Sequence, residues 1–225
     1  LVNYCEVDER IAYSYSKIHN EEEEKNLGDI KEVNPKDLPD FDLMTYGFPC
    51  TDISLMGKKQ GFDKGSDTKS SLLWEAMDIA KEKRPKYMLA ENVPNLVHGF
   101  RDDFGKWFDF LNRELGYRNY WKILNARDFG LPQGRERVFI MSIREDVDVD
   151  FKFPDRRDYV KLDDFLLDES EVADKYYIDK DLFIQTDDVK RVGCEIDVVG
   201  KLDKGGFESG RKVYNPEGIA PTITT

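Results

Sequence analysis

A cysteine and a glutamate in this sequence each follow a short apolar run. Cys50 lies in the turn-forming stretch TYGFPCTDIS, just behind the run FDLM, and Glu91 follows YMLA directly. A thiol presented by a turn at a strand end can act as a nucleophile, and a carboxyl group beside it can supply or hold a proton. These residue types therefore predict covalent catalysis assisted by an acid.

Both residues also have simpler interpretations. A lone cysteine behind a strand often packs as a small buried side chain, and a glutamate at a strand end can merely precede a turn, here with Asn92 as the cap. Arg135 and Arg137 alternate along a short stretch, which fits either a solvent-exposed strand edge or a pair of arginines that hold a substrate. The residues taken one at a time leave both interpretations open.

Alternating strand and helix patterns run as far as Pro154. Apolar runs predict strands at 1–7, 41–46, 87–90, 119–125 and 137–143. Helical spacing predicts three helices with the following apolar faces: Ile11, Tyr15 and Ile18 behind a cap at Asp8; Leu72, Leu73, Ala76, Met77 and Ala80; and Phe104, Trp107, Phe108, Leu111 and Leu115. Such alternation is typical of an open, doubly wound α/β sheet, and the irregular, glycine-rich remainder predicts a second lobe.

The predicted sheet brings the two candidate residues together. A single crossover helix joins the strands 41–46 and 87–90, so we expect these strands to be neighbours. Ligands of open α/β sheets bind beyond the carboxyl ends of the strands. The sequence therefore predicts that Cys50 and Glu91 share one cleft at that edge.

The composition indicates a globular chain without membrane segments. Its 225 residues are 40% hydrophobic, enough for one large domain or a domain with a smaller lobe. We expect a cytoplasmic protein with reduced thiols, because no apolar run is long enough to span a membrane and the three cysteines show no paired spacing. The cysteines and the two histidines also predict no metal site.

The charge is distributed unevenly along the chain. A net charge of −12 would by itself disfavour a nucleic-acid partner, because phosphate contacts need lysine and arginine. However, residues 145–188 hold sixteen acidic and only six basic residues, and the rest of the chain is close to neutral. Residues 57–69 carry four lysines among three glycines, which predicts a mobile, locally basic loop.

Three short motifs then occur in a familiar order. The segments GFPCTDIS (47–54), ENVPNL (91–96) and LPQGRERVFI (131–140) resemble the PC, ENV and QxRxR motifs of the cytosine-5 DNA methyltransferases. GDI at 28–30 and a serine–leucine–tryptophan pattern at 70–74 strengthen the resemblance. It extends over about residues 1–143 and returns at 211–225.

The resemblance implies a Rossmann-like, S-adenosylmethionine-dependent methyltransferase fold with a smaller target-recognition lobe. It predicts a catalytic core at 1–145 and a target-recognition region at 146–225. S-adenosylmethionine is the expected methyl donor, and double-stranded DNA, from which a cytosine is flipped, is the expected partner. The family further implies an enzyme of a bacterial or phage restriction-modification type, associated with the nucleoid.

The resemblance also implies roles for individual residues. The expected catalytic residues are Cys50, Glu91, Arg135 and Arg137. The expected donor-binding residues are Glu6, Val7, Asp29, Ile30, Pro49 and Leu72. The expected DNA-binding residues are Thr51, Ser54, Lys58, Lys59, Gln133, Lys204 and Arg211, and the loop 51–70 is expected to act as a lid.

Several features depart from the family pattern. Val7 stands where an aromatic residue is common, and Thr51 stands where glutamine is common. The glycine-rich first motif and the last two motifs are not in this sequence, so we expect additional segments or a second polypeptide to supply them. Two alternatives are a tRNA cytosine-5 methylase and a non-catalytic, DNA-binding relative of the family.

Overall fold

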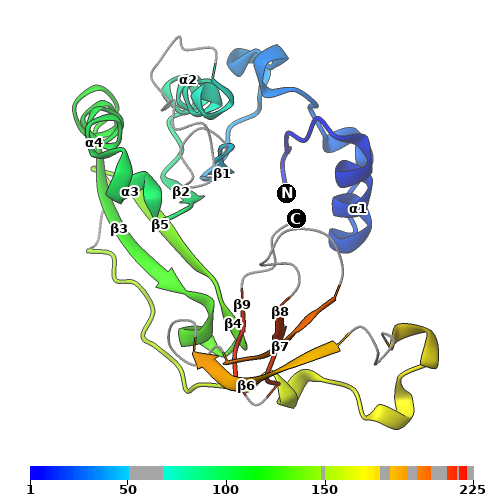
Figure 1. Cartoon of the computed structure of the whole chain (residues 1–225). Coiled ribbons are helices and arrows are strands. Elements are labelled where there is room, and N and C mark those ends of the chain that lie inside the picture. The colour runs from blue at the N-terminus through cyan, green and yellow to red at the C-terminus, as the bar shows by residue number, and fades with distance from the viewer. Residues whose placement is uncertain are drawn as a thin grey trace. The chain divides into compact units, whose positions relative to one another are not determined.

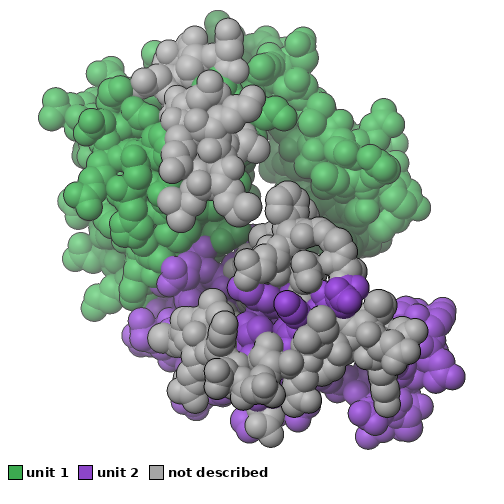
Figure 2. Space-filling model, in the orientation of Figure 1, with its two compact units in different colours: residues 1–123, 137–153 green, residues 124–136, 154–225 purple. Residues whose placement is uncertain are grey.

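The computed structural model describes residues 1–50, 68–147, 150–177, 183–191, 197–203, 212–216 and 218–221. The chain divides into two compact units, coloured separately in Figure 2. Unit 1 comprises residues 1–123 and 137–153, and unit 2 comprises residues 124–136 and 154–225.

A mixed four-stranded sheet forms the centre of unit 1 (Figure 1). Its strands are β1 (Leu43–Gly47), β2 (Tyr87–Asn92), β5 (Glu136–Arg144) and β3 (Tyr117–Asn125), in that spatial order. β1 runs parallel to β2, as the single crossover between them predicts, and β5 runs antiparallel to β2. The structure confirms the predicted α/β class.

The strands present one face to the core. In β2 the side chains of Met88, Ala90 and Asn92 are buried, whereas those between them are half-buried. The period of two follows from the pleat, which points successive side chains to opposite faces. Val138 and Ile140 on β5 continue the same buried surface.

Helices cover this buried surface. They are α2 (Leu73–Lys83), α3 (Asn95–Gly99) and α4 (Arg101–Asp109), which continues into a π-helical turn at Phe110–Glu114. The buried residues of α2 recur at helical spacing, as predicted. Arg84, in the left-handed conformation with φ of 51°, and the following proline end this helix.

Trp107 of α4 is the largest fully buried side chain of the core. Its indole Nε1 donates to Sδ of Met77 on α2 at 3.3 Å. The rings of Phe48 and Phe104 meet it edge to face at centroid distances of 5.8 and 6.0 Å. Trp107 thereby joins two helices to the turn that follows β1.

Replacing Trp107 with alanine should destabilise unit 1 strongly. Loss of a buried tryptophan costs about 3–5 kcal/mol through lost burial and the cavity left behind. Urea denaturation would measure the loss, with Trp121→Ala as the control because Trp121 is 46% exposed. The control should lose less than about 1 kcal/mol, and equal losses for the two variants would contradict this description of the core.

The N-terminal segment differs from expectation in two respects. Residues 1–7 form no strand. They contribute a single parallel bridge between Tyr4 and Asn26, because the described residues offer no extended segment with which they could pair further. The helix α1 (Glu9–His19) is capped by Asp8 as predicted. However, its buried residues are Ala12 and Ser16, while the predicted apolar face is largely exposed, with Ile11 at 55% and Ile18 at 77%.

Unit 2 contains two small sheets (Figure 1). β6 (Phe183–Arg191), β7 (Asp197–Leu202) and β8 (Lys212–Tyr214) form an antiparallel sheet. β4 (Gln133–Gly134) pairs in parallel with β9 (Ala220–Pro221), which ties a segment from the middle of the chain to one near its end. Short 3-10 turns at Asp163–Phe165, Glu169–Glu171 and Asp174–Tyr176 make up much of the rest. In the described parts of both units, every helix is too short or too polar to cross a membrane.

Candidate active site

The carboxyl ends of β1 and β2 lie side by side. The last residue of β1, Gly47, pairs with Glu91, and Cys50 follows three residues later. The expectation that Glu91 lies beyond its strand is wrong, because β5 extends the ladder by pairing with both Glu91 and Asn92. Glu91 is therefore held by strands on both sides, which fixes its backbone more firmly than a loop would.

An ion pair positions the Glu91 carboxylate. Nε of Arg137 on β5 lies 2.9 Å from Oε1 of Glu91, and the two side chains are 20% and 41% exposed respectively. The other oxygen, Oε2, would lie 3.8 Å from a Cβ atom at Gly47. The carboxylate thus lies between Arg137 and the end of β1, and it remains accessible to a ligand.

The turn that carries Cys50 is held by residues distant in sequence. The buried Phe48 side chain packs against the core, and Nδ2 of Asn92 donates to the Phe48 carbonyl oxygen at 3.1 Å. The hydroxyl of Ser70 donates to the Pro49 carbonyl oxygen at 2.5 Å. Cys50 itself is half-buried and packs against the core cluster, with a free thiol. The sequence analysis used Ser70 only as part of the serine–leucine–tryptophan pattern at 70–74 and predicted no contact for it, because a local pattern does not signal a contact across twenty residues.

Arg135 and Gln133 belong to unit 2, whereas Arg137 belongs to unit 1. The backbone amide of Arg135 donates to the Gln133 carbonyl, and the Arg135 carbonyl accepts from Ala126, both at 3.0 Å. Gln133 pairs with Ala220 in the parallel bridge of β4 and β9. The structure therefore brings Arg137 to Glu91, while Arg135 and Gln133 are fixed within the strands and turns of unit 2.

The predicted donor-binding residues Glu6 and Asp29 lie on adjoining segments. Asn26 joins them: its side chain accepts from the Glu6 amide at 2.9 Å and from the Gly28 amide at 3.1 Å, and it donates to the Glu6 carbonyl at 2.9 Å. Cys5 is exposed, but partial desolvation of its thiol, together with the nearby Asp29 carboxylate, raises the pKa of Cys5. Asn26 was not predicted from the sequence, since an asparagine two residues before a glycine signals only a turn.

The other predicted donor contacts are distributed over unit 1. Asp29 is exposed and caps the turn that begins at Ile30, and Ile30 packs against the core cluster. Leu72 is half-buried at the start of α2, and Pro49 is half-buried beside Cys50. Val7 is 72% exposed, which leaves an apolar surface next to Glu6.

Several predicted DNA-binding residues lie outside the described residues. They are Thr51, Ser54, Lys58, Lys59, Lys204 and Arg211. Most of the predicted lid, residues 51–67, also lies outside them. Among the residues that are described, no cluster of histidine, cysteine, aspartate and glutamate side chains could hold a metal ion.

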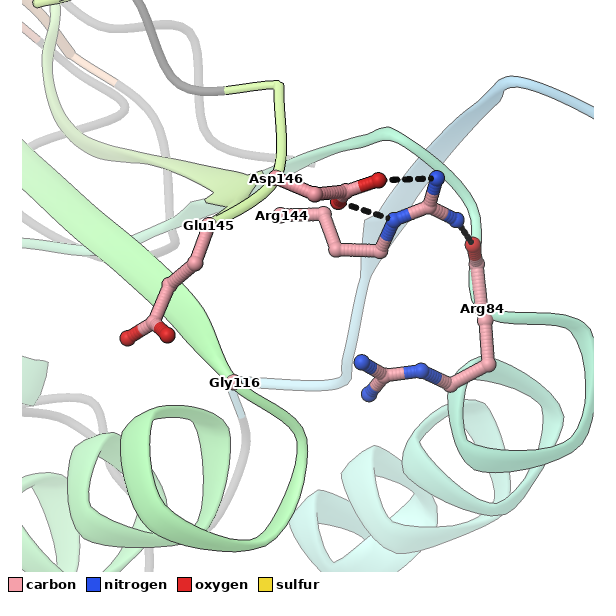
Figure 3. Close-up of a pocket in the computed structure, with 5 residues that line it drawn as sticks. All are labelled: Arg84, Gly116, Arg144, Glu145 and Asp146. Atoms are coloured by element: carbon pink, nitrogen blue, oxygen red, sulfur yellow. Dashed lines mark hydrogen bonds and ion pairs between the residues drawn. The ribbon is translucent and has the colours of Figure 1, made fainter.

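A separate polar pocket of about 420 Å³ lies at the other end of β2 (Figure 3). Arg84, Gly116, Arg144, Glu145 and Asp146 line it. The Arg144 guanidinium bridges the Asp146 carboxylate, at 2.6 and 3.0 Å, and the Arg84 carbonyl. Arg144 thus ties the end of β5 to the segment before β2, and the two arginines and two carboxylates of the lining carry no net charge.

This pairing should make stability depend on pH in acid. The hydrogen bond from Arg144 lowers the pKa of Asp146 below its ordinary value of 3.8. The Asp146–Arg144 pair therefore contributes its full stabilisation above the ordinary pKa of 3.8. This contribution is lost as the pH falls through the lowered pKa of Asp146. Urea midpoints of the wild type and Asp146→Asn should differ by a constant amount above about pH 5 and converge below pH 4. A constant difference down to pH 2 would contradict this role for the ion pair.

Comparison with known proteins identifies the family. The family described as C-5 cytosine-specific DNA methylase matches residues 1–223 of the chain. This match covers nearly the whole sequence, and it includes the Cys50 turn, the Glu91–Arg137 pair and both units. The chain belongs to the C-5 cytosine-specific DNA methylase family.

Individual relatives agree with this assignment. The chain is 50% identical over 155 residues to the type II methyltransferase M2.ScrFI of Lactococcus lactis subsp. cremoris, a match that covers 68% of this chain and 42% of the relative. It is 33% identical to the orphan methyltransferase M.SPRI of Bacillus phage SPR, over all of this chain and 58% of the relative. The chain thus spans about half the length of the curated relatives it matches.

A solved structure shares the fold. It is titled as a DNA modification methyltransferase encoded within an E. coli prophage, and it superposes with a TM-score of 0.59 at 17% identity. The superposition covers 99% of this chain and 75% of that structure. This likeness supports the methyltransferase fold for both units of the chain.

Proposed function

We propose that this protein is a DNA (cytosine-5)-methyltransferase that uses Cys50 as a covalent nucleophile. The observation that carries the proposal is the Glu91–Arg137 ion pair at the end of β2, beside the turn that holds Cys50. Family membership supports the activity, because the matching relatives are named as methyltransferases.

The chemistry explains why these groups belong together. Carbon 5 of cytosine is a poor nucleophile, so the Cys50 thiolate first adds to carbon 6 and makes carbon 5 electron-rich. Glu91 holds the ring at nitrogen 3 and the exocyclic amine, which favours the addition. After the methyl group has joined carbon 5, the proton on that carbon leaves as the carbon–sulfur bond breaks. The products are 5-methylcytosine, the regenerated Cys50 thiolate, the proton released from carbon 5, and S-adenosylhomocysteine, which is the donor without its methyl group.

Arg137 has two tasks in this scheme. It orients the Glu91 carboxylate through the 2.9 Å contact, and it is proposed to hold the carbonyl oxygen of the base. A planar guanidinium can bind a carboxylate and a carbonyl oxygen at the same time. Arg135, in unit 2, is proposed to contact the base or the adjacent phosphate.

The reaction requires a base outside the helical stack. A cytosine within duplex DNA cannot reach a thiol that lies in a turn at a sheet edge, so the target base must be flipped out. We assign residues 1–145 to the catalytic core and 146–225 to target recognition. Gln133 and the basic residues predicted above are the proposed DNA contacts.

The methyl group is supplied by S-adenosylmethionine. Glu6 fits ribose binding, because Oε1 of its carboxylate accepts from the Asp8 amide at 2.9 Å, Oε2 has no hydrogen-bond partner among the described residues, and its backbone is fixed by Asn26. Asp29 and Ile30 are proposed to bind the adenine, and Pro49 and Leu72 to line the path towards Cys50. The exposed Val7 side chain offers an aliphatic surface for the adenine ring.

We further propose that the working enzyme includes segments beyond these 225 residues, on the same or a second polypeptide. The chain spans about half of its curated relatives. In addition, the described residues pair β1 on one side only, with β2, so its other edge can accept a strand. Completion of the sheet there would enclose the donor site.

Transfer of a labelled methyl group from S-adenosylmethionine tests the proposed function. The chain, and a version extended at both ends, would be incubated with duplex DNA or with tRNA. Label in 5-methylcytosine of DNA supports the proposal. Label in tRNA alone would favour the tRNA methylase, and DNA binding without transfer by either version would favour the non-catalytic relative.

A further inference from the structure

Ser70 is a fully buried serine that contacts the turn of the proposed nucleophile. It lies in the 3-10 turn Lys69–Leu72 that precedes α2, and none of its surface is exposed. Its hydroxyl donates to the Pro49 carbonyl oxygen at 2.5 Å, across 21 positions of sequence. A buried hydroxyl with so short a hydrogen bond is a defined structural link rather than a solvated side chain.

The link acts on the peptide that leads into Cys50. Because a peptide unit is planar and includes the Cα of the next residue, fixing the Pro49 carbonyl oxygen also fixes the plane in which the nitrogen and Cα of Cys50 lie. Pro49 has no amide hydrogen of its own with which to anchor the turn. The preceding carbonyl, of Phe48, is held separately by Asn92 at 3.1 Å. Two successive carbonyls are therefore held by side chains from different elements.

We propose that Ser70 is a positioning residue for Cys50. It touches no substrate; it sets the direction of the thiol through the Pro49–Cys50 peptide, so that the sulfur meets carbon 6 of the base. This inference rests on the proposed function for its catalytic consequence. The structural part, that Ser70 holds the thiol, is independent of DNA and donor.

The rate at which Cys50 is alkylated tests the structural part. Iodoacetamide would be applied at several pH values, and modification of Cys50 followed by mass spectrometry of peptides. Loss of one buried hydrogen bond should make opening of the turn about tenfold more frequent, so Ser70→Ala should alkylate about tenfold faster at Cys50. Cys5, on the N-terminal segment, serves as the internal reference and should not change.

Two serines provide matched controls. Ser71 is the next residue, but its hydroxyl donates locally to the Thr68 carbonyl at 2.6 Å, so Ser71→Ala should leave Cys50 unchanged. Ser142 is 1% exposed, and its hydroxyl has no hydrogen-bond partner among the described residues, so Ser142→Ala controls for the loss of a buried hydroxyl. An unchanged rate in Ser70→Ala, or equal changes in all three variants, overturns the proposal.

Ser70→Thr separates positioning from stability. Threonine keeps the hydroxyl but adds a methyl group at a position that is already fully buried, so the variant should have a lower urea midpoint. Its Cys50 alkylation rate should stay near that of the wild type. Methyl transfer should fall about tenfold or more in Ser70→Ala and recover in Ser70→Thr. Alkylation rates that follow the urea midpoints overturn the proposal. A different outcome would refute the proposed function instead. In that outcome, Ser70→Ala alkylates faster than the wild type as expected, but the wild-type protein transfers no methyl group, even in its extended version.

Discussion

Replacing Cys50 with alanine is expected to reduce methyl transfer by a factor of about 10⁵ or more, because removing the nucleophile of a covalent mechanism removes the reaction path itself. Cys50→Ser should be almost as inactive, since a serine hydroxyl ionises far less readily than a thiol. Initial rates with labelled S-adenosylmethionine and duplex DNA, using the version of the protein that is active, would measure the loss.

Cys5 supplies the control for this prediction. It is also a free cysteine of unit 1, but it lies on the segment bridged to Asn26 rather than in the turn behind β1. Cys5→Ala should retain at least about a third of the activity, and the free energy of unfolding of Cys50→Ala should stay within about 1 kcal/mol of the wild-type value. A Cys50→Ala variant that folds and still transfers methyl groups would refute the covalent mechanism.

Replacing Arg137 with alanine is expected to reduce kcat by about 10² to 10³, the usual effect of removing one preorganised donor from an active site. The loss has two sources: the Glu91 carboxylate loses the partner 2.9 Å away that orients it, and the base loses a donor. Arg137→Lys should recover only part of the rate, because an ammonium group cannot reproduce the planar fork. Single-turnover rates at saturating DNA would separate kcat from binding.

Arg144 is the matched control, at the opposite end of the same strand. Its guanidinium also pairs with a carboxylate, that of Asp146, and it is 25% exposed compared with 20% for Arg137. Arg144→Ala should lower stability without a specific effect on kcat. If both variants lost activity in proportion to their loss of stability, Arg137 would have a structural role only.

The local sequence could predict the central architecture. One crossover helix between two apolar strands leaves few arrangements other than parallel neighbours, and β1 and β2 are paired in this way. The buried face of α2 also follows from its spacing, because a helix with one continuous apolar stripe has one face to bury. These features depend on residues close together in the chain.

Other features depend on partners that a local pattern cannot specify. Glu91 lies within β2 because β5, some fifty residues later, continues the ladder past it. The predicted face of α1 is wrong because Ala12 and Ser16 are small enough to pack closely, whereas Ile18 finds no cover among the described residues. The roles of Asn26, Ser70 and Asn92 arise from hydrogen bonds between distant segments. Spacing along the sequence carries no signal for such bonds.

The covalent adduct itself provides the most direct test of the account. The protein would be mixed with S-adenosylmethionine and duplex DNA containing 5-fluorocytosine, whose carbon 5 has no proton to lose after methyl transfer. The account predicts an adduct that survives denaturation, carries the added methyl group, maps to Cys50 by mass spectrometry, and is absent in Cys50→Ala. Transfer to normal cytosine without any such adduct, or an adduct on a different residue, would contradict the assignment of Cys50 as the nucleophile.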